Sequence, residues 1–401
     1  MANLFRRPPA NFWHSLPFDG QGLFSSGNSS LASLRRQSAA SFWKQVPFWS
    51  RPPLIAISRL GWVAAACHRI FRHLSSEPMP PSLAIRILGD CISTGASPNE
   101  ALIWRQFFNP AAPHPLPGRA ASGLLSRLGN SDEHRLVADK QLTAELLARE
   151  GLPVPPLLGL LRHGEFPGPA APLWCEPARL FVKPRIGAAS RGTFSLEVTG
   201  AGTCRINNGS TVPIESLRDR LTFAATGDFL VQPYLFAAPA LADLTTAGAA
   251  PVLRITTARN PREAPFLHSA LLAIDVPGES PRHFIRGQLR VPIDVVTGQM
   301  RSGIWFLHPD RRYPSLPWNH APLTGRTIPD LPAALEMALR AMDLLPGLPL
   351  VNWDLIVTPS GPVILEGNTC GNWILTNLSM IDEPGTTPLD LLLRKWAGSA
   401  R

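Results

Sequence analysis

Apolar residues recur at two different spacings along the chain, and the change between them divides it. From residue 53 to 109 they recur at steps of three and four, as in Leu60, Val63, Ala64 and Cys67, which is the spacing of one helix face. From about residue 133 short apolar runs alternate with helical stretches. We expect strands at 180–183, 194–198, 229–235, 252–257, 268–274, 287–293, 350–357 and 363–367, and helices at 140–149 and 331–343. This order predicts a mixed α+β fold with antiparallel strand pairs.

This change of pattern divides the chain into three predicted parts. Residues 1–52 mix Arg, Gly, Ser and Pro with aromatic residues, which predicts a flexible basic and aromatic leader. Residues 53–132 are predicted to be a helical region and a linker, with a capping box at Ser97-Pro98-Asn99-Glu100. Residues 133–398 are predicted to form the main domain.

Composition narrows the class of protein. The net charge of +9 comes from 38 Lys and Arg against 29 Asp and Glu, and without a run of five basic residues we expect no nucleic-acid partner. The longest apolar stretch, 54–67, is interrupted by Ser58, Arg59 and Gly61, so no transmembrane segment is expected. Five cysteines without a CxxC pair favour a reduced, cytoplasmic protein. For the leader, the alternatives to a merely flexible segment are a docking segment and peripheral contact with an anionic membrane surface.

Lysine is rare in this chain. It occurs only at positions 44, 140, 183 and 395, whereas Arg occurs 34 times. Because Arg is the usual cation here, a retained Lys suggests a place where a compact ammonium fits and a planar guanidinium does not.

The strongest candidate site is an acidic hairpin. Two β-branched runs flank Pro359-Ser360-Gly361, whose composition is that of a turn. A hairpin centred on Ser360 places Asp354 opposite Glu366 and Asn352 opposite Asn368, with all four side chains on one face. The other face would carry the apolar residues Leu355, Val357, Val363 and Leu365.

The chemistry of this polar face points to a cation. Two carboxylates that face each other across a strand pair repel, and we expect no Lys or Arg to balance them. A divalent cation neutralises them, and oxygen ligands of this kind suit Mg²⁺ that also holds a substrate phosphate. The alternative is a solvated hairpin with an acidic outer face.

Three further segments carry weaker signals. Lys183 lies at the end of an apolar strand and is followed by a small-residue loop, 187–192. This loop could cover phosphates, or it could simply connect two strands. Asp139-Lys140 begins a helix, and the alternative is a helix cap followed by a surface lysine. Gln232-Pro233 interrupts a strand. The freed backbone and the Gln232 amide could bind the edge of a purine, or the segment is simply an edge strand.

These segments, in this order, resemble the ATP-grasp superfamily, and in particular its sugar-transfer-associated branch. The resemblance covers about 135–395 and rests on Asp139-Lys140 with Gly151-Leu152-Pro153-Val154-Pro155, Phe181-Val182-Lys183-Pro184, Leu230-Val231-Gln232-Pro233, the strand with Arg254, and Trp353-Asp354, Gly361-Pro362 and Glu366-Gly367-Asn368. It implies an ATP-grasp fold, in which two α+β lobes clasp ATP, with a first lobe at 133–230 and a second at 231–398.

The resemblance also implies roles for single residues. Lys140 and Lys183 would hold nucleotide phosphates, and Ser190 and Gly192 belong to the loop that would cover them. Gln232, with the backbone of Pro233 and Leu235, would contact adenine. Asp354, Glu366 and Asn368 would hold Mg²⁺ or Mn²⁺, and Arg254 would face the γ-phosphate or the reacting carboxylate. Asp243 is the candidate for binding ribose.

The implied activity is an ATP-dependent ligation. A small-molecule or saccharide-linked acid would be activated as an acyl phosphate, which an amine or thiol acceptor then attacks, with a link to polysaccharide biosynthesis. The sequence departs from the ligases at Asn352, because these usually carry Arg there, and Arg286 or Arg290 is the candidate substitute. A kinase of a small hydroxyl substrate and a non-catalytic nucleotide-binding subunit of a sugar-transfer complex are the alternatives.

Overall fold

The computed structural model describes most of the chain beyond the leader. The described residues are 43, 46–76, 80–107, 121, 124–125, 127–161, 176–187, 192–200, 202–207, 209–217, 227–246, 248–283, 285–308, 311–369, 378 and 388–399. They fall into two compact units, one of residues 130–369 and the other of 1–129 with 370–401. Most of the predicted leader, and Ser190, lie outside the described residues.

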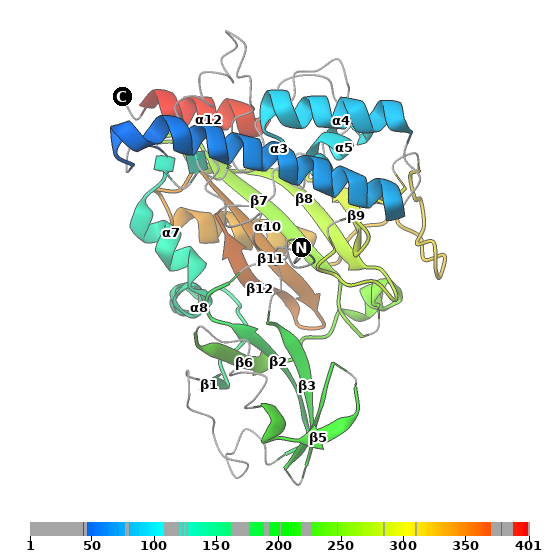
Figure 1. Ribbon diagram of the computed structural model, residues 1–401. Helices are drawn as coiled ribbons and strands as arrows, with labels where there is room; N and C mark the ends of the chain where they lie inside the picture. Colours follow the sequence, from blue (N-terminus) through cyan, green and yellow to red (C-terminus); the bar gives the residue numbers. More distant parts are fainter. Residues whose placement is uncertain are drawn as a thin grey trace. The chain divides into compact units, whose positions relative to one another are not determined.

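The unit of residues 130–369 contains both sheets that the described residues form (Figure 1). Its helices are α7 (Ser131–Ala138), α8 (Lys140–Arg149), the 3-10 helix η3 (Pro239–Leu244) and α10 (Leu331–Asp343). Its strands are β1 (Gly159–Leu161), β2 (Ala178–Pro184), β3 (Phe194–Gly200), β4 (Thr203–Ile206), β5 (Thr211–Pro213), β6 (Phe229–Pro233), β7 (Val252–Arg259), β8 (Pro265–Asp275), β9 (Gln288–Ile293), β10 (Ile304–Trp305), β11 (Leu350–Thr358) and β12 (Gly361–Asn368).

All strand pairs in both sheets are antiparallel. The first sheet has the order β1-β6-β2-β3-β4-β5, and the second has the order β10-β9-β8-β7-β11-β12. The mixed α+β fold class is therefore confirmed. The lobe boundary predicted at 230/231 falls inside β6, which pairs with β1 and β2, so the first sheet ends at Pro233.

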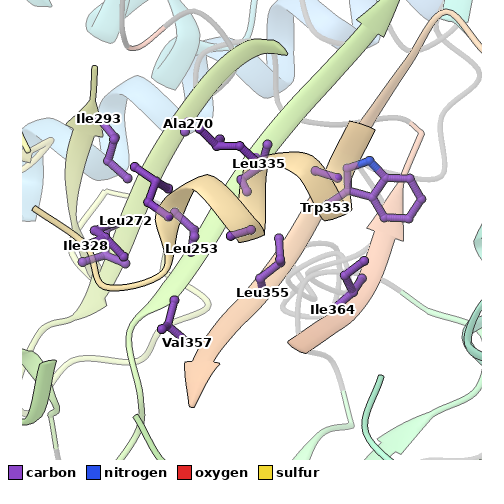
Figure 2. Close-up of a cluster of buried hydrophobic side chains, with 14 of the residues drawn as sticks. Leu253, Ala270, Leu272, Ile293, Ile328, Leu335, Trp353, Leu355, Val357 and Ile364 are labelled. Carbon is purple, nitrogen blue, oxygen red and sulfur yellow. The ribbon is translucent and has the colours of Figure 1, made fainter. Parts of the chain in front are cut away.

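One face of the second sheet forms the main core. In β11 the odd-numbered residues Val351, Trp353, Leu355 and Val357 point into it, as the alternation of side chains along a strand requires. Figure 2 shows core side chains of the sheet, among them Leu253, Leu272 and Leu355, gathered around α10, which contributes Leu335. The even-numbered residues of β11 therefore face the other side of the sheet.

Helix ends follow the local signals of the sequence. Asn130 caps α7 by accepting from the N–H groups of Asp132 and Glu133. Asp139 caps α8 by accepting from those of Gln141 and Leu142, and the helix ends before Gly151, whose φ is 70°. The bounds of α8 and α10 agree with the predicted 140–149 and 331–343.

The other unit is helical where it is described. It contains the 3-10 helix η1 (Phe48–Ser50), α3 (Arg51–Ser76), α4 (Pro81–Thr94), α5 (Pro98–Phe107) and α12 (Pro388–Ser399). The predicted capping box is confirmed, because the N–H of Ser97 donates to Oε2 of Glu100 at 2.8 Å and the N–H of Glu100 donates to Oγ of Ser97 at 3.4 Å. Helix α12 groups with this unit, although the main domain was predicted to run to residue 398.

Among the described residues, no helix is both long and apolar enough to cross a bilayer.

Candidate nucleotide and metal site

The predicted pairing of the acidic hairpin is confirmed. Asn352 lies opposite Asn368, and Asp354 lies opposite Glu366. The turn, however, is centred between Pro359 and Ser360, because Thr358 pairs with Gly361, and a β-bulge beside Asp354 compensates for the difference. The polar residues are therefore paired as expected, although the turn has a different centre.

The bulge changes which residues form the apolar face. Leu365 is the extra residue of β12, so Ile364 points into the core beside Leu355 and Val357. Val363 and Leu365 are only half-buried, and their predicted place on the core face is wrong because the prediction had no bulge.

Close packing explains why the residue between Glu366 and Asn368 is a glycine. Gly367 lies opposite Trp353, and a Cβ at this position would lie 2.9 Å from the Trp353 ring. The indole is fully buried and donates from Nε1 to Oγ1 of Thr257 at 2.9 Å. The hydrogen bond thus ties the strand that carries Asp354 to β7, and the indole packs against the strand that carries Glu366 where Gly367 leaves room for it.

Lys183 contacts the hairpin at the bulge. Its Nζ donates to the carbonyl oxygen of Leu365 at 3.0 Å, which places the ammonium beside the residue next to Glu366. The side chain is almost completely buried, and burial lowers the pKa of Lys183 to about 8, against the raising effect of Glu366. The end of the first sheet and the acidic face of the second sheet therefore meet at this lysine.

Lys140 approaches the same carboxylate from α8. Its Nζ lies 3.6 Å from Oε2 of Glu366 and donates to the carbonyl oxygen of Gly187 at 2.6 Å. Asp139 is the helix cap that the alternative interpretation expected. Lys140 is not a surface lysine, however, because only 9% of its side chain is exposed.

Arg185, which sequence reasoning did not single out, orients the start of α8. Its Nε lies 2.9 and 2.8 Å from the two carboxylate oxygens of Asp139, and its carbonyl oxygen accepts from the N–H of Lys140. The sequence signal for Arg185 was its position two residues after Lys183. A bidentate Arg–carboxylate pair holds two segments in a fixed orientation. Lys140 and Lys183 are thereby positioned by one connected network.

The acidic face is balanced by an arginine, contrary to the prediction. Arg254 lies directly opposite Asp354 on the neighbouring strand β7, and it donates from Nε and Nη2 to the two carboxylate oxygens at 2.7 and 2.8 Å. Burial acts to lower the pKa of Arg254, but the charge and hydrogen bonds of Asp354 outweigh it and raise that pKa. The prediction failed because this counter-ion lies 100 residues earlier in the chain.

The two asparagines lie on the same face. The amide nitrogen of Asn368 is 3.4 Å from Oδ2 of Asp354 and 3.5 Å from Oε1 of Glu366, so it bridges the two carboxylates. A half turn of this amide presents its oxygen there instead. Asn352 is buried, accepts from Oγ1 of Thr256 at 2.8 Å and donates to the carbonyl oxygen of Asn368 at 3.4 Å.

Arg290, one of the two candidate substitutes for an arginine at position 352, lies in β9. Its side chain is buried, and its guanidinium carbon lies 4.5 Å from the centre of the Phe306 ring. Burial, and next the charge of Arg254, lowers the pKa of Arg290 to about 9. Arg286 is only half-buried and donates its backbone N–H to Nδ1 of His283.

The charges of this cluster suit a metal that arrives with an anion. Asp354 and Glu366 face three cations, Arg254, Lys140 and Lys183, so the cluster has a net positive charge. A bare divalent cation is repelled by such a cluster, whereas a polyphosphate that carries Mg²⁺ is attracted by it. Within the described residues, no group of three His, Cys, Asp or Glu forms a metal site. The two carboxylates and the Asn368 amide are the oxygen donors, and they fit Mg²⁺ held jointly with phosphates.

The predicted adenine contacts lie in the first sheet. Gln232 is buried in β6 and donates from Nε2 to the carbonyl oxygen of Pro155 at 3.3 Å. Strand β6 is flanked by β1 and β2, so the edge-strand alternative is wrong. Pro233 is the last residue of β6, and Leu235 follows it in a half-buried position.

Two other predicted residues stand apart from the cluster. Asp243 accepts two hydrogen bonds of 2.8 Å from the guanidinium of Arg326, an ion pair that does not involve the cluster. Gly192 has a φ of 77°, and a Cβ there would lie 3.0 Å from the ring of Pro184, which accounts for the glycine. The loop residues between Gly187 and Gly192 lie outside the described part of the chain.

The protein is similar to distant solved structures. One is N5-carboxyaminoimidazole ribonucleotide synthetase from Thermotoga maritima, with a TM-score of 0.36 and 13% identity over 66% of this chain and 49% of that one. Another is D-alanine–D-alanine ligase from Bacillus anthracis complexed with ATP, with a TM-score of 0.36 and 13% identity over 67% of this chain and 71% of that one. These TM-scores are too low for any residue or substrate to be transferred to this chain.

A third similar structure is the biotin carboxylase domain of the Hydrogenobacter thermophilus 2-oxoglutarate carboxylase, complexed with MgADP. Its TM-score is 0.43, with 14% identity over 71% of this chain and 53% of that one. The chain thus spans about half the length of this domain and of the synthetase. No curated protein matches the sequence.

The family comparison gives the decisive match. The model of the sugar-transfer-associated ATP-grasp family matches residues 120–391, which include both sheets and every residue of the cluster. This range is about two thirds of the chain and agrees with the resemblance found over 135–395. The chain therefore belongs to the sugar-transfer-associated ATP-grasp family.

Proposed function

We propose that the protein is a Mg²⁺-dependent ATP-consuming ligase that joins a carboxylic acid to an amine or a thiol. The observation that carries the proposal is the convergence of Lys183, Lys140, Asp354, Glu366 and Asn368 around one point, although they come from four separate elements, β2, α8, β11 and β12. Two ammonium groups beside two carboxylates bind the phosphates and the metal of a nucleotide at the same time.

Each group has a role in this proposal. Lys140 and Lys183 hold phosphate oxygens, and Asp354, Glu366 and Asn368 supply oxygen ligands to Mg²⁺ or Mn²⁺. When bound there, the metal would neutralise charge on the phosphates and hold them in one orientation. Gln232, with the backbone around Pro233 and Leu235, contacts adenine. The contact of Gln232 with Pro155 supports this assignment, because it holds the amide in one orientation.

The chemistry then needs no nucleophile from the protein. An oxygen of the acid attacks the γ-phosphorus of ATP, ADP leaves, and an acyl phosphate forms. The amine or thiol next attacks the carbonyl carbon, the phosphate leaves, and the nucleophile loses its proton. Positioning and charge neutralisation supply most of the rate in phosphoryl transfer of this kind. Arg254 faces the reacting oxygens in this scheme.

The acid is proposed to be a small molecule or a saccharide-linked acid, from a process linked to polysaccharides. This part of the proposal is supported by the name of the family alone.

Two competing functions remain open to test. A kinase would use the same residues to transfer the phosphoryl group to a hydroxyl and keep it there. A non-catalytic nucleotide-binding subunit is favoured by Asn352, which is uncharged and tied to Thr256 where ligases usually carry Arg.

Product analysis separates the three functions. The full-length protein is incubated with Mg-ATP and pairs of acids and amines or thiols, and ADP, phosphate and products are measured. A ligase releases ADP, phosphate and an amide or thioester in equal amounts. A phosphorylated product without free phosphate identifies a kinase, and ATP binding without any ADP release across the screen contradicts an enzyme.

A further inference from the structure

The start of the N-terminal helical unit exposes a stripe of apolar side chains. In η1, Phe48 and Trp49 are 78% and 72% exposed, and in α3 Ile57 and Leu60 are 61% and 59% exposed. Pro53, Ala64 and Cys67 are exposed as well. The positions 53, 57, 60, 64 and 67 follow one another at steps of three and four, so they lie on one face of the helix. We call Phe48, Trp49 and these five positions the apolar stripe.

The stripe is not an unfinished core. The opposite face of α3 carries Trp62, Ala65, Ala66 and Ile70, which are buried, and α3 packs on α4 and α5 through its own unit. Single exposed apolar residues are ordinary on protein surfaces, and Val296 in the other unit is one. A continuous row over four helical turns, preceded by an exposed Phe and Trp, is the pattern of an interaction surface.

The positive charge of the chain is concentrated in the same part of the sequence. Residues 1–76 contain nine Lys and Arg and a single acidic residue, Asp19, out of 38 basic and 29 acidic residues in the whole chain. They therefore carry eight of the nine net positive charges, and the other 325 residues are close to neutral. Helix α3 itself contains Arg51, Arg59, Arg69 and Arg72 and has no Asp or Glu.

We propose that η1 and the first turns of α3 lie in the surface of a lipid bilayer that contains anionic lipids. An apolar helix face with exposed aromatic residues enters the boundary between headgroups and acyl chains, while basic residues contact the anionic headgroups. The absence of acidic residues from α3 removes the repulsion that such headgroups would otherwise exert. The proposal does not depend on the proposed function.

Charge complementarity selects this occupant over a second copy of the chain. A symmetric contact between two α3 helices would bring two basic segments together, since the same surface is used on both sides. A bilayer with anionic headgroups instead supplies the opposite charge over the whole area. The membrane contact considered for residues 1–52 from sequence is therefore placed mainly on α3.

The test uses the full-length protein and vesicles in a sedimentation assay. Vesicles of phosphatidylcholine alone are compared with vesicles that also contain phosphatidylglycerol. We expect at least about tenfold tighter binding to the anionic vesicles, and weaker binding at high salt, because salt screens exposed charges. The double variant Ile57→Glu/Leu60→Glu should lower this binding by about tenfold or more. The matched control Val296→Glu places a carboxylate at another exposed apolar position and should bind as the wild type does.

A second variant separates weaker vesicle binding from a loss of folding. Phe48→Ser/Trp49→Ser changes only η1, and it should also weaken vesicle binding with an unchanged thermal midpoint. The proposal is overturned if the wild type binds neither kind of vesicle, or if Ile57→Glu/Leu60→Glu binds like the wild type. It is also overturned if that variant instead abolishes a concentration-dependent dimer. A lower thermal midpoint with unchanged vesicle binding would mean that the leader covers the stripe, which likewise contradicts the proposal.

Discussion

The two sheets have the same number of strands and the same antiparallel pairing, but they contribute opposite charges to the candidate site. The second sheet supplies both carboxylates, Asp354 and Glu366, together with the counter-ion Arg254 from the next strand. The first sheet supplies the ammonium of Lys183, which contacts the second sheet through the carbonyl oxygen of Leu365. The second sheet thus has one internal ion pair on its polar face, whereas the buried cation of the first sheet has its hydrogen-bond partner on the second sheet.

This difference suggests a division of work. If the second sheet holds the metal, its variants should affect turnover or stability, whereas variants of Lys183 should affect nucleotide affinity. The predictions that follow test this division.

The largest effect is expected from Glu366→Gln. It keeps the shape of the side chain but removes a charged metal ligand, so Mg²⁺-dependent ATP consumption should fall by about a thousandfold or more. ADP release measures this rate, and circular dichroism should show an unchanged fold. Glu336→Gln, on an exposed position of α10, is the matched control and should retain full activity. Full activity in Glu366→Gln would refute a catalytic role for this sheet.

Arg254→Met tests the ion pair within the second sheet. Asp354 is buried and would lose its bidentate partner, so the free energy of unfolding should fall by about 2–4 kcal/mol. Urea denaturation measures this quantity, with Arg282→Met at an exposed position as the control. A second substitution, Asp354→Leu, should recover part of the loss, because no unpaired charge then remains. If Arg254→Met is as stable as the wild type, the pair does not stabilise the sheet.

Lys183→Met tests the contribution of the first sheet. The apolar stem is retained but the charge is lost, so ATP affinity should fall by about a hundredfold, or about 2.7 kcal/mol. Stability should be nearly unchanged, since the variant also removes a charge that burial disfavours. Isothermal titration measures the affinity, and Lys395→Met is the exposed control. An unchanged affinity for ATP would exclude Lys183 from the nucleotide site.

The smallest effect concerns pH. Because burial lowers the pKa of Lys183 to about 8, the free protein loses this proton between pH 7 and 9, and ATP affinity should fall by up to about tenfold over that range. Lys183→Met should lack this part of the pH dependence. The folded state releases the proton at about 8 and the unfolded state at about 10.5, so the contribution of Lys183 to stability should rise over that interval. A wild-type affinity that does not change from pH 7 to 9 would contradict a charged Lys183 as a ligand.

The sequence predicts well those features that depend on neighbouring residues. Helix α8 has its cap, Asp139, and its terminating Gly151 in the sequence itself, and both ends agree with the structure. The facing pairs of the acidic hairpin also follow from alternation around a short turn. The short strands β1, β4, β5 and β10 were not predicted, because runs of two to four residues carry too little pattern.

Features that depend on distant contacts could not be predicted. Arg254 and Asp354 are 100 residues apart, and Lys183 and Leu365 are 182 apart, so no local spacing indicates either contact. The bulge at Leu365 leaves no signal in the apolar pattern of β12. Only the resemblance to a family placed Lys183 near Glu366 before the structure did.

The contact between Lys183 and Leu365 has a consequence for how a ligand is held. An ammonium has three N–H bonds, and the main-chain carbonyl takes one of them, so two remain to reach a phosphate. Lys183 can therefore bind a nucleotide phosphate without breaking its hydrogen bond to β12. The same side chain then connects the two sheets and binds the ligand.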